Sequence, residues 1–166
     1  RENPKGPVMN DFAIQTNLLV KRLQTFEFLR GLDHETLLKL SRSAVWKIYL
    51  PDAVIFWEGD LENHLFYLQY GWLKVIKTTP DGHEQILRFV GPGEVFNEIG
   101  VFAKRPNPAT AMALEEAGIW RIPRPALEEA LLRHPQIALQ VMEMMAERVI
   151  SLVSLTVDLS LRPVEA

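Results

Sequence analysis

The sequence predicts a mainly β fold, a closed sandwich or jelly roll with flanking helices and a long C-terminal helix. Short runs of alternating apolar residues begin at Val45 and continue to Ile122, which is the spacing of half-buried strands. Glycine and proline turn signals separate these runs at regular intervals. Seven or eight short strands of this kind are typical of closed antiparallel folds.

The elements before the strands are expected to be a tail and two short helices. Residues 1–16 contain two prolines and a glycine among residues of mixed polarity, which predicts a tail that is either irregular throughout or helical near its end. The domain proper is expected to cover 17–134. Apolar residues at helical spacing indicate a first helix over about 18–26, and Asp33 suits the N-cap of the second. The residues of the second helix expected to face the core are Leu37, Leu38 and Leu40.

The strands are bounded by turn residues on both sides. They are expected at 46–50, 54–57, 65–68, 72–77, 85–90, 110–114 and 118–122. The segment Pro80-Asp81-Gly82 is a strong hairpin signal between the fourth and the fifth of them. Pro125 suits the first turn of a helix, so the helical period is expected to return there.

The last helix is too long for the core of one small domain. It is expected over 135–161, where no glycine or proline interrupts the run, and this gives a length of about 40 Å. Its apolar surface is wider than one buried stripe requires. One part can cover the chain's own core, and the rest predicts a partner helix in a homodimer. The expected interface residues are Val141, Met145, Arg148, Val149, Leu152, Leu155, Thr156 and Leu159.

Two other interpretations of this helix were weighed against a dimer seam. The helix could be buried within one domain or against an absent one, but the lack of charge between Arg148 and Asp158 favours a seam. A membrane span is disfavoured, because that uncharged run has nine residues and a bilayer needs about 20.

Composition argues against several classes of function. The net charge of −3 gives no overall basic surface for nucleic acid. The chain has no cysteine, which excludes disulfides, thiolate metal sites and an iron–sulfur cluster within it. With no signal peptide recognised, a cytoplasmic location is expected.

The histidines do not form a metal-binding pattern. A metal-dependent cupin enzyme needs clustered imidazoles and a carboxylate around one metal, whereas His34, His64, His83 and His134 are isolated in the sequence. Haem would need an axial His or Met in a cavity, and the methionines of the last helix suit core packing better. The sequence contains no triad, P-loop or dinucleotide fingerprint, so we expect a protein that is not an enzyme.

Several short motifs follow one another in a characteristic order before the long helix. They are Glu58-Gly59-Asp60, Tyr70-Gly71-Trp72-Leu73-Lys74-Val75, Pro80-Asp81-Gly82, residues 91–100 and residues 109–114. Each motif is weak alone, but together they resemble the sensor domain of CRP/FNR-type bacterial transcription regulators.

This resemblance implies an organisation for the whole chain. Residues 17–134 would form a double-stranded β-helix jelly roll of the cyclic-nucleotide-binding-like type, which binds an effector. Residues 135–161 would pair two subunits and pass the signal from the bound effector, so that the dimer acts as an allosteric sensor. Residues 162–166 would be a hinge toward a DNA-binding helix-turn-helix domain that is absent from this chain.

The resemblance also places a ligand pocket. Its residues would be Phe96, Asn97, Glu98, Ile99, Gly100, Asn107, Pro108, Ala109, Thr110, Arg88, Leu152 and Val153. In cyclic-nucleotide binders of the family, the segments matching residues 96–100 and 107–110 form a phosphate-binding cassette. Its short helix presents N–H groups to the phosphate, its Glu holds the ribose and its Arg pairs with the phosphate.

The sequence departs from this cassette where the phosphate would bind. Asn97 stands at the cassette glycine, Asn107 at or next to the arginine, and Pro108 at the Ser/Thr position. Cyclic AMP or another cyclic nucleotide is therefore a candidate effector with a degenerate cassette. There are two alternatives to a cyclic nucleotide. The pocket could bind a different small ligand, or it could be empty in a module used only for assembly. Arg88 could replace the missing cation if it points inward, or it could be a strand-edge arginine with its head in water.

Overall fold

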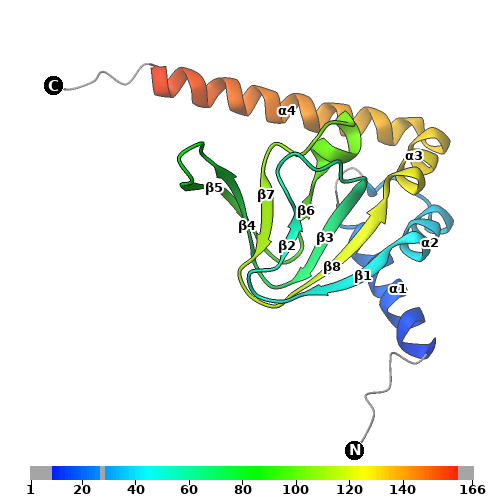
Figure 1. The fold of residues 1–166 in the computed structure, drawn as a ribbon. Coiled ribbons are helices and arrows are strands. Elements are labelled where there is room, and N and C mark those ends of the chain that lie inside the picture. Colours follow the sequence, from blue (N-terminus) through cyan, green and yellow to red (C-terminus); the bar gives the residue numbers. More distant parts are fainter. Residues whose placement is uncertain (1–8, 27–28, 161–166) are drawn as a thin grey trace, which may run out of the picture.

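The computed structural model describes residues 9–26 and 29–160, which form two facing antiparallel sheets flanked by helices (Figure 1). The strand orders are β1-β8-β3-β6 and β2-β7-β4-β5. The strand bounds are β1 (Val45–Tyr49), β2 (Val54–Phe56), β3 (His64–Tyr70), β4 (Leu73–Thr78), β5 (Glu84–Val90), β6 (Val95–Phe96), β7 (Thr110–Ala113) and β8 (Ala117–Pro123). This two-sheet arrangement confirms the predicted jelly roll.

The helices pack on the outer face of the sheet β1-β8-β3-β6. Figure 1 shows α1 and α2 beside β1, with α3 above them and α4 running across the top of the sheets. Their bounds are α1 (Met9–Leu23), α2 (His34–Ser43), α3 (Arg124–Arg133) and α4 (Pro135–Ser160). A short π-helix, η2 (Ile99–Ala103), follows β6 and contacts β3.

Two apolar cores lie on the two faces of that sheet. Along β8, Ile119 faces the space between the sheets, whereas Trp120 faces the helices, as the two-residue period of a strand requires. The helix-side core contains Leu19, Leu37, Leu40, Tyr67, Trp120, Ile122 and Ile137. The core between the sheets contains Phe56, Phe66, Leu68, Leu73, Phe96, Ala111 and Ile119.

Local sequence signals predicted most boundaries well. Asp33 caps α2 as expected, because its Oδ1 accepts a hydrogen bond of 2.9 Å from the backbone N–H of Thr36. Helix α1 begins at Met9, so the end of the predicted tail 1–16 is helical and is continuous with the first predicted helix. The structure also adds β6, a strand of two residues that is too short to show a period. The predicted hinge 162–166 lies outside the described residues.

Helix α4 is anchored at its first turns and open beyond them. Ile137 and Val141 are buried in the helix-side core, so Val141 packs within its own chain, and its place in a dimer seam stays a prediction. Met145 is half-buried. The side chains of Arg148, Leu152, Leu155, Thr156 and Leu159 lie outside the described part of the structure. The exposed apolar side chains of the helix are Leu139, Met142, Val149, Ile150 and Val153.

A polar cluster fixes the junction between α3 and α4. His134 ends α3, and its Nε2 lies 2.8 Å from Asp33 Oδ2 and 3.0 Å from Thr36 Oγ1. Thr36 Oγ1 also donates to Asp33 Oδ2 over 2.8 Å. The cap of α2 therefore also holds the start of α4, and the hydrogen bonds from Thr36, with the nearby His134, lower the pKa of Asp33.

Acid should weaken this junction in a defined direction. Because folding lowers the pKa of Asp33 below its ordinary value of 3.8, the carboxylate stabilises the fold above that pH, and this contribution is lost as the pH falls. We expect the melting temperature of the wild type to fall more steeply between about pH 4 and pH 2.5 than that of Asp33→Asn, which cannot titrate. Asp52→Asn, in an exposed turn, should behave as the wild type does. Parallel curves for wild type and Asp33→Asn would contradict this account.

A candidate ligand pocket between the sheets

A pocket of about 130 Å³ opens where β6 and the short helix η2 face the second sheet. It is lined by Phe56, Val75, Arg88, Phe96, Asn97, Glu98, Ile99, Asn107, Pro108 and Ala109. The structure therefore brings together eight of the twelve residues predicted for a ligand pocket. Phe56 and Val75 were missed, although strand alternation places both on the inner face of their sheet.

A second hollow of about 150 Å³ lies between α2 and α3. Its charged side chains are already paired along the helices, Lys39 with Glu35 at 3.0 Å and Arg133 with Glu129 at 2.8 Å. It lies on the helix side, away from the residues at which the sequence predicts a ligand. The pocket between the sheets is therefore the better candidate site.

Asn97 shapes the pocket through its backbone. Its φ of +71° lies in the left-handed region that a glycine would adopt easily and that asparagine tolerates better than most residues. Its Nδ2 donates to the carbonyls of His64, at 2.8 Å, and Glu62, at 3.2 Å. The asparagine thus adopts a backbone conformation that favours glycine, and its side chain ties the turn to the start of β3.

Gly100 lies behind this turn and not on the pocket wall. A Cβ at this position would lie 2.6 Å from Asn97 Oδ1 and 2.9 Å from the carbonyl oxygen of Glu62. These distances are shorter than van der Waals contact. The glycine is therefore required for packing, and its predicted contact with a ligand stays a prediction.

Asn107 cannot replace the missing arginine in this conformation. Its backbone N–H donates to the carbonyl of Asp60, and its carbonyl accepts from the N–H of Gly59, both at 2.9 Å. The side chain is only 3% exposed, and its Nδ2 is sealed from solvent without a hydrogen-bond partner. An amide held in this way reaches a ligand only if the loop moves.

The neighbouring residues of this wall are held by the same loop. The hydroxyl of Thr110 is buried and accepts a 2.9 Å hydrogen bond from the N–H of Glu58. Lys77 Nζ lies 2.6 Å from Glu58 Oε1 and donates to the carbonyl of Pro108 over 3.0 Å. Thr110 therefore supports the wall of the pocket, and its predicted contact with a ligand stays a prediction.

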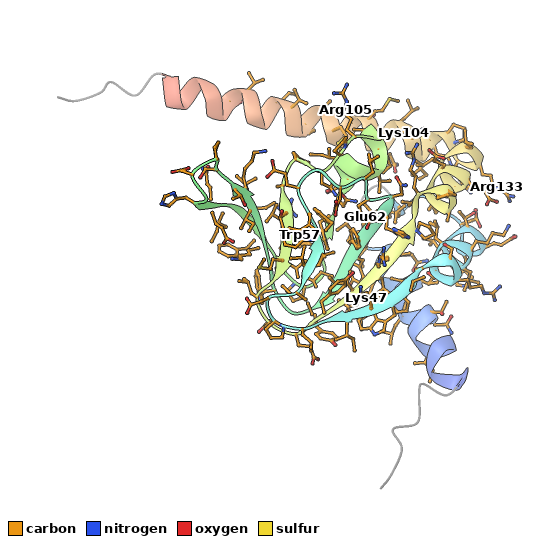
Figure 2. All side chains as sticks on the ribbon, viewed as in Figure 1. Lys47, Trp57, Glu62, Lys104, Arg105 and Arg133 are labelled. Atoms are coloured by element: carbon orange, nitrogen blue, oxygen red, sulfur yellow. The ribbon has the colours of Figure 1, made fainter. Side chains whose placement is uncertain are left out.

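The two charged residues of the pocket come from opposite sheets. Arg88 on β5 lines the pocket opposite Val75 of β4, while its side chain remains 42% exposed, 3.8 Å from Glu94. Arg88 therefore combines the two alternatives given by the sequence, because its side chain lines the pocket and remains partly exposed to water. Glu98, which follows β6 in the facing sheet, is buried. Lys104 and Arg105 follow the short helix (Figure 2) and do not line the pocket.

Stacked phenylalanines form the apolar floor of the pocket. The rings of Phe66 and Phe96 stack with centroids 5.0 Å apart, and Phe56 and Phe66 stack at 5.7 Å. Phe56 and Phe96 face the pocket, and Phe66 lies fully buried between the sheets. Such rings form a rigid apolar surface on which a flat group can pack.

Helix α4 does not close the pocket in this chain. None of the described lining residues comes from α4, and Val153 is 58% exposed. Figure 1 shows the C-terminal half of α4 passing above the β4–β5 hairpin. The side chain of Leu152 lies outside the described part. The contact of Val153 with a ligand therefore stays a prediction, since Val153 does not line the pocket of the single chain.

A charged cluster lies behind the cassette. Glu62, which is labelled in Figure 2, contacts His64 Nδ1 through Oε1 at 2.5 Å and Arg121 Nη2 through Oε2 at 3.5 Å. The guanidinium of Arg121 lies 5.8 Å from the ring of Phe66. Among the described residues, no three His, Asp or Glu side chains are placed to hold a metal ion.

Comparison with known proteins places this fold in a family. The sequence profile of the cyclic nucleotide-binding domain matches residues 46–134. The chain belongs to the cyclic nucleotide-binding domain family. It is 28% identical over 130 residues to a CRP-like cAMP-activated global transcriptional regulator of Mycobacterium tuberculosis, covering 78% of this chain and 49% of the regulator. The chain spans about half the length of the first curated relatives that it matches.

Solved structures of regulators share the architecture. The sensor domain of the transcriptional regulator DNR from Pseudomonas aeruginosa superposes with a TM-score of 0.78 at 22% identity, over 92% of this chain and 99% of that one. The catabolite activator protein of Thermus thermophilus has a TM-score of 0.68 at 27% identity, over 83% of this chain and 62% of that one. Among the described helices, none combines the length and hydrophobicity needed to cross a bilayer.

The role of Asn97 can be separated into backbone and side chain. Asn97→Gly keeps the left-handed turn and removes the two hydrogen bonds, which should cost about 1–3 kcal/mol of unfolding free energy. Asn97→Ala should cost about 1 kcal/mol more, because alanine disfavours positive φ. Urea unfolding of both variants measures the difference. If Asn97→Gly is as stable as the wild type, the amide does not hold the cassette.

Proposed function

We propose that this chain is the effector-sensing and dimerisation domain of a CRP/FNR-like transcription regulator. The observation that carries the proposal is the pocket, which the cassette residues Phe96 to Ile99 and Asn107 to Ala109 form together between the sheets. The curated regulator of Mycobacterium tuberculosis supports the same assignment, since its name describes activation by cyclic AMP. A small molecule in this pocket is the effector.

The dimer forms through α4. Val149, Ile150 and Val153 are each at least 58% exposed on the described part of this helix, and such a row of apolar side chains is stabilised by packing against a second helix. Two copies of α4 would lie against each other, as the sequence predicts from the width of the apolar surface. Contact with DNA belongs in this proposal to a helix-turn-helix domain outside the chain, consistent with its net charge of −3.

The effector acts by changing the packing of the two α4 helices. This is allostery only if the ligand binds the two arrangements with different affinity. The alternative is a ligand-free module used for assembly, which the sealed amide of Asn107 would suit. Saturable binding of a small molecule in the pocket would favour the sensor over the ligand-free assembly module.

A charge placed in the proposed seam should separate the subunits. Val149→Glu would bury unpaired like charges across the interface, so the variant should sediment as the 19.0 kDa monomer where the wild type sediments as a dimer. Gln140→Glu is the matched control, because Gln140 is exposed on the same helix and lies away from the face that carries Val149, Ile150 and Val153. If Val149→Glu sediments as a dimer at the same concentration, α4 is not the seam.

A further inference from the structure

The pocket combines one cation, Arg88, with an apolar floor formed by Phe56 and Phe96. We infer that the pocket binds a small organic anion with an apolar body of about one ring, and that Arg88 holds its anionic group. The inference rests on the proposed sensor function and assigns a chemical class to the effector. Arg88, on strand β5, thus takes the role that the cassette arginine has in cyclic-nucleotide binders.

Arg88 is the one cation among the ten described residues that line the pocket. It pairs across the strands with Val75, another lining residue, and it alternates with Val90, which is buried between the sheets. The backbone therefore directs Arg88 to the inner face of its sheet. Its side chain keeps access to both the pocket and the solvent.

The present partner of Arg88 is easily exchanged. Glu94 Oε1 lies 3.8 Å from Arg88 Nη2, and the two side chains are 50% and 42% exposed. An exposed pair at this separation contributes little stability. A carboxylate arriving through the pocket can form the shorter two-pronged contact that a guanidinium favours.

The cassette wall, in contrast, cannot hold an anion. Pro108 has no backbone N–H, and the amide of Asn107 is sealed from solvent. Lys77 already contacts Glu58 and the carbonyl of Pro108. An anion is therefore favoured at the β5 side, where Arg88 lies.

The volume restricts the body of the ligand. A cavity of 150 Å³ in another protein holds one benzene molecule, and this pocket has about 130 Å³. One ring, or a branched chain of similar size, can pack against Phe56 and Phe96. A purine, a ribose and a cyclic phosphate together exceed this volume and would extend out of the open mouth of the pocket. A hydroxyl or amino group on the ring could donate a hydrogen bond to Glu98.

Benzoate and benzamide test the inference, because they share a shape and differ in charge. We expect benzoate to bind saturably in an NMR titration of the domain and to shift amide signals of residues 95–99 and of Arg88. Benzamide should bind at least about tenfold more weakly, and Arg88→Gln should weaken benzoate binding by a similar factor and leave benzamide unchanged. Glu94→Gln should tighten benzoate binding, because it frees Arg88.

Controls separate binding from folding. Arg133→Gln removes an exposed arginine on α3, outside the pocket, and should bind benzoate as the wild type does. Arg88→Lys keeps the charge and should retain part of the affinity, provided that each variant melts at the wild-type temperature.

Four results would overturn the inference. Equal binding of benzoate and benzamide, or unchanged benzoate binding by Arg88→Gln, would show that Arg88 holds no anion. Saturable binding of cyclic AMP without binding of benzoate would refute the ligand class and leave the sensor function standing. If neither benzoate, benzamide nor cyclic AMP shifts any pocket signal, the inference fails and the ligand-free assembly module is favoured.

Discussion

The fold depends on one sheet that is buried on both of its faces. The strands β1-β8-β3-β6 carry Phe66, Phe96 and Ile119 toward the second sheet, and Tyr67 and Trp120 toward the helices. Residues next to each other in β3 and β8 therefore belong to different cores. Since alternate side chains point to opposite faces, a shift of one residue in register would exchange the two cores and destroy both.

The pocket and α4 are connected through this sheet. The rings of Phe96 and Phe66 stack beneath the pocket, while Ile137 and Val141 of α4 pack in the core on the other face. The cluster of His134, Thr36 and Asp33 holds the start of α4 beside α2. A ligand that changes the packing on one face of the sheet can thus change the packing of α4 on the other face. This is the physical basis of the coupling that we propose.

The sequence predicted the layout of the domain because its signals are local. Alternation and turn residues place the strands, and Asp33 marks the start of α2. It missed β6, because two residues show no period, and it did not show that Val141 packs within its own chain, because helical spacing does not distinguish a chain's own core from a partner. The positive φ of Asn97 and the support of Thr110 by Glu58 depend on the folded chain, so no sequence pattern revealed them. Alternation did place Arg88 on the inner face, but it could not show how far its head reaches water.

Hydrogen exchange of the domain, with and without saturating benzoate, tests the coupling most directly. The account predicts changed protection at residues 95–110, in β3, and in the first turns of α4 around Ile137, which lies on the far face of the sheet from the pocket. Protection that changes only at residues 95–110 and on β5, with α4 unaffected, would contradict the claim that pocket and helix are linked through the shared sheet.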